Sequence, residues 1–109
     1  MIRTTTNKHG QTILDMAVAS ALAKIRKAFK EAGWPMGKVL GRYYAFGPSQ
    51  TVIRGISVSR VGCSETIALH WKTPDHNESH KEHERKAIEF LRALGFPVQD
   101  NGFIDCRYY

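Results

Sequence analysis

The feature that most constrains the fold is residues 38–72, which carry three β-strand patterns in a row. Segments 38–46, 51–61 and 65–72 are rich in β-branched and aromatic residues and are separated by the turn segments 47–50 and 62–64. In the last of them Ile67, Leu69 and Trp71 alternate with smaller or more polar neighbours, which is the period of a strand with one buried face. The stretch therefore predicts three consecutive strands in a mainly antiparallel sheet of four or five strands.

The middle segment departs from this alternation at one position. Val52, Ile56 and Val58 predict a buried face, but Arg54 falls on the same face. Either Arg54 lies near a sheet margin, with its stem buried and its guanidinium in water, or a bulge near Gly55 shifts the register.

An amphipathic helix is predicted on each side of the strands. Residues 12–32 carry apolar side chains at intervals of three and four, Thr12 and Asp15 have the spacing of a helix start, and Gly33 provides the stop. A second helix follows Pro74 and ends at Gly95. Its start has three candidate capping residues: Asp75, Asn77 and Ser79.

These elements predict a single small α+β domain with both helices packed on one face of the sheet. The 109 residues suffice for one modest core, so we divide the chain into a flexible polar arm, residues 1–11, and one domain, residues 12–109. The Asp100-Asn101-Gly102 turn predicts one or two closing strands after the second helix. No apolar run is long enough to span a membrane and the N-terminus lacks an apolar signal core, so we expect a cytoplasmic protein that does not bind membranes.

No motif in the chain specifies a reaction. The glycines form no phosphate-binding loop, and no spacing ties a serine or cysteine to a general base. Cys63 and Cys106 are expected to be free thiols. We therefore expect a binding protein without enzymatic activity and without a cofactor, zinc apart.

The formal net charge of +6 favours a polyanionic partner, with nucleic acid or a ribonucleoprotein first. Cations interleaved with tyrosines would contact phosphates and stack on RNA or DNA bases. The candidate residues for this role are Lys24, Arg26, Lys27, Lys30, Arg42, Tyr44, Arg54, Arg60, Lys72, Arg107 and Tyr108. The alternative for the cations of residues 24–30 is a solvated helix face.

A histidine cluster is the one candidate for a metal site. His76, His80 and His83 lie at spacings of four and three, which would place imidazoles on one face of a helix and allow them to share a zinc ion. The segment has no thiolate and no His-Glu-x-x-His pattern, so structural binding is favoured over catalysis, and a charged, solvated helix start is the alternative.

The predicted order of helix, three strands and helix resembles the layout of double-stranded RNA-binding domains. The basic residues near the start of the second helix are similar to that family's phosphate-contacting lysines. The family's Lys-Lys-x-Ala-Lys helix start is replaced here by residues 75–81, which are partly acidic, so the resemblance concerns layout alone.

A protein partner is the second hypothesis. A small chain with tyrosines, no catalytic motif and a polar arm fits the accessory inhibitors of phages and mobile elements, which occlude a host complex. Arg107 with the terminal tyrosines would suit such an interface. A related hypothesis is a protein that sequesters a small phosphorylated nucleotide between the subunits of a homodimer.

Overall fold

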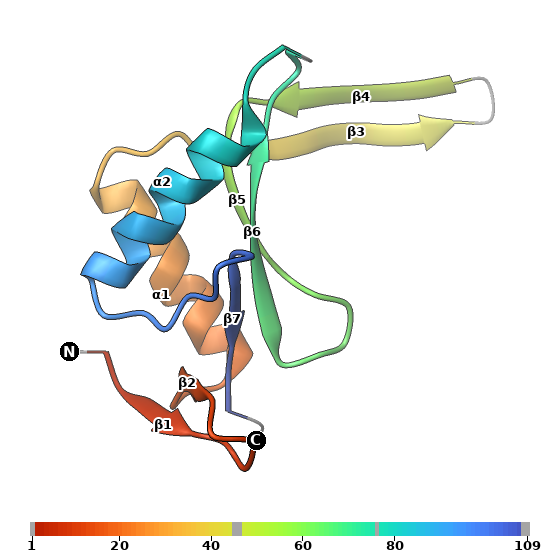
Figure 1. Ribbon diagram of the computed structural model, residues 1–109. Helices are drawn as coiled ribbons and strands as arrows, with labels where there is room; N and C mark the ends of the chain where they lie inside the picture. The colour runs from red at the N-terminus through yellow and green to blue at the C-terminus, as the bar shows by residue number, and fades with distance from the viewer. Residues whose placement is uncertain (1, 45–46, 76, 108–109) are drawn as a thin grey trace.

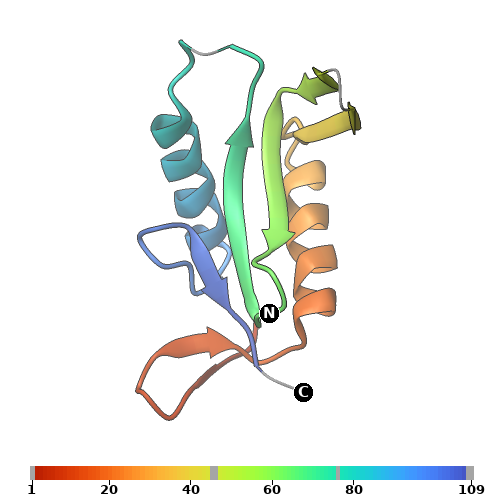
Figure 2. The same cartoon turned by 90° about the vertical axis from the view of Figure 1, so that its right-hand side faces the viewer.

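A three-stranded antiparallel sheet with two helices on one face forms the body of the protein. The computed structural model describes residues 2–44, 47–75 and 77–107. The sheet has the order β5 (Gly55–Arg60), β6 (Thr66–Lys72) and β7 (Phe103–Asp105), and α1 (Val18–Glu31) and α2 (His80–Ala93) cover one side of it (Figures 1 and 2). The predicted α+β domain is thereby confirmed.

The core lies between the helices and this sheet. Helix α1 buries Val18, Ala21, Ile25 and Phe29, at the three- and four-residue spacing of its predicted stripe. The sheet contributes the alternating positions of its strands, and α2 adds one turn of apolar residues. The buried apolar residues of the sheet and α2 are Ile56, Val58, Ile67, Ala68, Leu69, Trp71, Ile104, Ala87, Ile88 and Leu91. The predicted burial of Ile67, Leu69 and Trp71 is thus confirmed, whereas Ala68, predicted on the exposed face, is buried as well.

The strands of residues 38–72 do not form one sheet, so the prediction of a four- or five-stranded sheet is wrong. Strands β3 (Lys38–Tyr44) and β4 (Gly47–Ile53) form a separate antiparallel pair that projects from the body (Figure 1). We call this pair the arm. The predicted middle strand, residues 51–61, is divided at Arg54, and residues 47–50 begin β4 instead of forming a turn.

The first helix begins later than its spacing predicts. Thr12 and Asp15 do not cap it: β2 (Thr12–Leu14) pairs with β1 (Thr4–Thr6), and α1 starts after Ala17, which makes no side-chain cap. Burial explains the difference, because Ile13 and Leu14 cover the end of the core and Leu14 pairs with Cys106 beyond β7. Residues 4–6 belong to the N-terminal segment 1–11 that was predicted to be flexible, and they form the strand β1.

The second helix begins at His80. Of the three candidate caps Ser79 has this role, since its hydroxyl oxygen accepts a hydrogen bond from the backbone N–H of Glu82. Gly33 and Gly95 follow the two helices with positive φ angles, as their predicted role as stops requires. Within the described residues no helix is long and apolar enough to cross a membrane.

Candidate nucleic-acid interface

The arm is anchored to the body at the crossing of two glycines. Gly37 donates a backbone hydrogen bond to Ile56, and Ile56 donates one to Pro35, both at 2.8 Å. A Cβ atom on Gly37 would overlap the Gly55 carbonyl, and one on Gly55 would overlap the Pro35 carbonyl. The arm therefore leaves the body at a point where two segments of the chain cross so closely that only glycine fits at either position.

Beyond this crossing the arm side chains that the structure describes are exposed or half-buried. β3 and β4 pair only with each other, so the outer edge of each strand has no strand partner in the described chain. Val39 and Leu40 are 43% and 47% exposed. The arm points away from the helices, on the open side of the three-stranded sheet (Figures 1 and 2).

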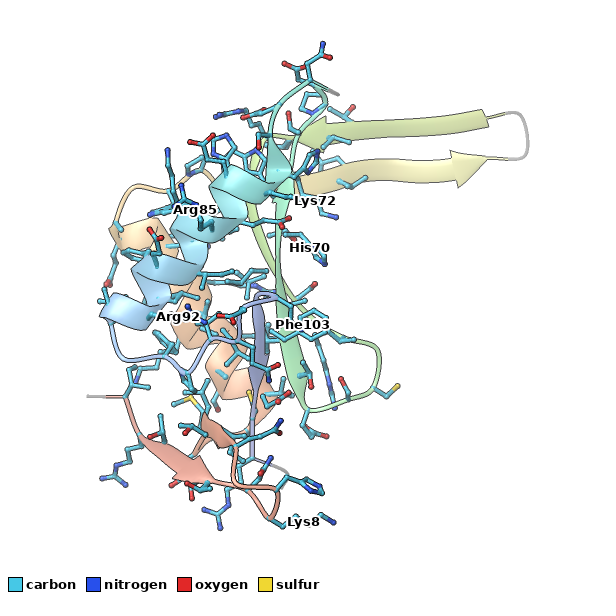
Figure 3. All side chains as sticks on the ribbon, viewed as in Figure 1. Lys8, His70, Lys72, Arg85, Arg92 and Phe103 are labelled. Atoms are coloured by element: carbon cyan, nitrogen blue, oxygen red, sulfur yellow. The ribbon has the colours of Figure 1, made fainter. Side chains whose placement is uncertain are left out.

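A basic groove lies in the corner between the arm and the body. It has a volume of about 580 Å³ and runs along the outer edge of β5. Its cations come from three parts of the chain: Arg26 and Lys30 from α1, Lys38 from the start of β3, and Lys72 from the end of β6. None of the described residues that line it carries a carboxylate. Figure 3 shows Lys72 on the sheet just below the arm.

The cations of the basic groove differ in what they contact. The Arg26 guanidinium donates two hydrogen bonds to the carbonyl oxygen of Val58, at 2.7 and 3.2 Å, and so covers the free edge of β5. Lys30 and Lys38 are exposed and Lys72 is half-buried, and in the described part of the chain none of the three forms an ion pair. Ser57 and Ser59 add hydroxyls to the same groove. The groove can therefore receive an anion with little rearrangement.

Arg54 contributes to a cluster on the other side of the arm's base. It donates to Glu78 at 2.7 Å, and its guanidinium carbon lies 4.9 Å from the centre of the Trp71 ring. His83 stacks on the same ring at 4.1 Å and contacts Glu78 at 3.0 Å. Hydrogen bonds from Arg54 and Thr73 lower the pKa of Glu78 to about 2, so this carboxylate is charged at neutral pH.

Arg60 and Arg107, which were predicted to contact nucleic acid, form hydrogen bonds and ion pairs within the protein. Arg60 donates to the carbonyl oxygens of Cys63 and Ser64 and pairs with Glu65, which ties it to the turn between β5 and β6. Arg107 pairs with Asp15 at 2.7 Å, near the N-terminal strands. Neither arginine is among the described residues that line the basic groove.

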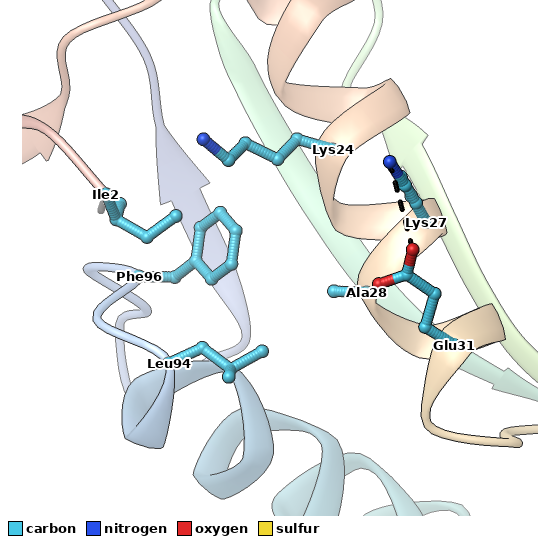
Figure 4. A pocket seen from close by; sticks show the side chains of 7 residues that line it. All are labelled: Ile2, Lys24, Lys27, Ala28, Glu31, Leu94 and Phe96. Carbon is cyan, nitrogen blue, oxygen red and sulfur yellow. Dashed lines mark ion pairs between the residues drawn. The ribbon is translucent and has the colours of Figure 1, made fainter.

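Lys24 and Lys27 lie on a different side of α1 from Arg26 and Lys30. They line a second hollow of about 340 Å³ between α1 and the end of α2, with Ile2, Leu94 and Phe96 opposite them (Figure 4). Lys27 pairs with Glu31 at 3.8 Å there. The helix-1 cations predicted as one surface are thus divided between two.

Arg42 and Tyr44 belong to β3, which places their backbone in the arm. Their side chains, and Tyr108, lie outside the described residues, so their predicted contacts with nucleic acid stay predictions.

Of the three histidines of the predicted cluster, His76 lies outside the described residues, so its part in the hypothesis stays a prediction, and α2 begins at His80. His80 contacts the Trp71 carbonyl oxygen through Nδ1 at 3.0 Å, and His83 lies between Trp71 and Glu78. Across the described ranges no group of three His, Cys, Asp or Glu side chains is arranged to hold a metal ion.

The two cysteines are free and lie in contrasting surroundings. Cys63 is exposed in the turn between β5 and β6, whereas Cys106 is buried beside β2. Burial raises the pKa of the Cys106 thiol to about 11. Cys106 therefore acts as a core residue.

Lys38 was not among the residues singled out from the sequence. The missed signal is the distribution of acids: no Asp or Glu lies between Glu31 and Glu65, although Lys38, Arg42, Arg54 and Arg60 fall within that interval. The arm and the outer edge of β5 come from this acid-free interval. A scan for missing carboxylates would have indicated this part of the chain.

No protein-family model, curated protein or solved structure matches this chain.

Proposed function

We propose that this protein is a non-enzymatic nucleic-acid-binding protein whose basic groove contacts the phosphate backbone. The observation that carries the proposal is the convergence of Arg26, Lys30, Lys38 and Lys72 on one groove, whose described lining contains no carboxylate. The backbone of a nucleic acid presents a regular row of phosphate anions, and lysine and arginine side chains bind these phosphates.

Two further features support this assignment. The net charge of +6 would attract a polyanion from a distance, and the acid-free interval concentrates that attraction on the arm and the groove beside it. The Ser57 and Ser59 hydroxyls can donate to phosphate oxygens beside the lysines. The cytoplasmic location predicted from the sequence remains part of this proposal.

The test is a binding titration against nucleic acid at several salt concentrations. The variant Lys30→Gln, Lys38→Gln, Lys72→Gln removes three charges from the basic groove. Its matched control, Lys8→Gln, Lys81→Gln, Lys86→Gln, removes three charges elsewhere, and Lys8 lies at the opposite end of the molecule (Figure 3). Arg26 is left intact because it bonds to β5.

If each groove lysine contacts a phosphate, the plot of log K against log salt becomes shallower by about 3 units in the groove variant, since each contact contributes about 0.9. The control should keep most of the wild-type slope. Equal losses in the two variants would mean that only net charge matters, and absence of binding by the wild type at physiological salt would refute the proposal.

A further inference from the structure

The arm has the form of an independent two-stranded ribbon. Its strands pair from Lys38 opposite Ile53 to Tyr44 opposite Gly47, and the start of β3 lines the basic groove with Lys38 and Val39. Seven residues of β-strand span about 23 Å at about 3.3 Å per residue. The ribbon leaves the body and returns to it at the crossing of Gly37 and Gly55, so the connection from α1 to β5 does not require it.

The composition of the arm argues against association with a second copy of the chain. Residues 38–53 contain Lys38 and Arg42 and no acidic residue, so two arms side by side would bring like charges together. The same charges attract a polyanion. The arm also carries tyrosine, serine and glutamine, whose side chains can form hydrogen bonds with base edges.

The width of a two-stranded ribbon selects among nucleic-acid grooves. Paired strands lie about 4.8 Å apart, which with side chains fits the major groove of B-form DNA, about 12 Å wide. The major groove of A-form RNA is deep and too narrow for such an element. At about 3.4 Å per base pair, the length of the arm corresponds to about seven base pairs.

We infer that the partner is duplex DNA in the B form, with the β3–β4 arm in the major groove and the basic groove on the adjoining phosphate backbone. This inference rests on the proposed function and narrows it. Lys38 belongs to both the arm and the basic groove. A duplex whose major groove holds the arm would therefore also lie beside the basic groove. Base edges are then read by the arm, while the groove fixes its position on the backbone.

The experiment compares three probes of one sequence at physiological salt: duplex DNA, duplex RNA and single-stranded DNA. Wild-type protein should bind duplex DNA about tenfold or more tightly than the other two, a difference that one good base-edge contact can produce. A shortened-arm variant, in which Asn-Gly replaces residues 41–50, keeps the three strand pairs nearest the body, from Lys38–Ile53 to Leu40–Thr51. It should lose the preference for duplex DNA and retain the weak, salt-dependent binding of the groove.

A second variant, Arg42→Ala with Tyr44→Ala, keeps the arm at full length. It replaces the shortened-arm variant in the experiment if that variant is not folded, as shown by the lack of a cooperative unfolding transition. It should reduce the preference for duplex DNA in the same direction. Methylation of guanine N7, which lies in the major groove, should interfere with binding of the wild type.

The outcomes separate the two proposals. Equal affinity for the DNA and RNA duplexes, tighter binding of single strands, or a DNA preference that survives both arm variants would overturn the inference and leave the proposed function standing. Absence of binding to all three probes would overturn the proposed function, and the inference with it.

Discussion

The body and the arm of this protein are stabilised in different ways. The body buries residues such as Phe29, Ile25 and Ile67 completely between two helices and a sheet. In the described residues the arm is one strand pair outside the main sheet, an arrangement that is marginal in water by itself, and it joins the body at Gly37 and Gly55. The difference teaches that the folding energy of the chain lies in the body, while the arm is available for contact with a partner.

The largest effect that tests this comparison is the loss of a core side chain. Phe29→Ala should lower the free energy of unfolding by about 3–5 kcal/mol, because Phe29 is fully buried against Trp34 and Phe90. Leu40→Ala, in the arm, should change it by about 0.5 kcal/mol or less. Urea unfolding measures both. A loss of several kcal/mol for Leu40→Ala would show that the arm packs against other residues and would break the comparison.

An intermediate effect is expected where the arm joins the body. Gly55→Ala places a side chain at φ 151°, against the Pro35 carbonyl, and should destabilise the protein by about 3 kcal/mol. Gly10→Ala is the matched control, since it also has a positive φ but faces open space, and should cost about 1 kcal/mol. Thermal unfolding of the two variants measures the difference. Equal losses of stability in the two variants would mean that the close approach of Gly55 to Pro35 does not contribute to stability.

The smallest effect concerns the ion pair between Arg54, at the exit of the arm, and Glu78, before α2. The folded pKa of Glu78 is about 2 and its ordinary value is 4.5, so its contribution to stability is complete above about pH 4.5 and is lost as the pH falls toward 2. Glu78→Gln should flatten the pH dependence of the urea midpoint in that window. Glu89→Gln, at an exposed helix position, should leave it unchanged. Identical curves for Glu78→Gln and the wild type would show that the ion pair between Arg54 and Glu78 does not stabilise the protein.

The local patterns of the sequence predicted the body better than the arm. The alternation of Ile67, Leu69 and Trp71 and the stripe of α1 are repeated over several residues, so each fixes both the element and its buried face. The grouping of strands into sheets depends on contacts between distant segments. The start of α1 was misplaced because Leu14 and Val18 have helical spacing although Leu14 belongs to β2.

The candidate site was predicted as a set of charges and not as a surface. On α1, Lys24 and Lys27 lie on one side and Arg26 and Lys30 lie on another, and no local pattern tells which side meets the arm. The partners of Arg54 and Arg107 lie 24 and 92 residues away in the chain. Only the fold shows which cations remain available to a ligand.

Arg26 also has a consequence for the behaviour of the protein in concentrated solution. A free strand edge such as that of β5 is a template on which another chain can add a strand, and such addition leads to aggregation. The Arg26 guanidinium occupies the Val58 carbonyl oxygen and places a positive charge at that edge. The side chain that adds charge to the basic groove therefore also protects the sheet edge, next to the backbone bonds of Pro35 and Gly37 to Ile56.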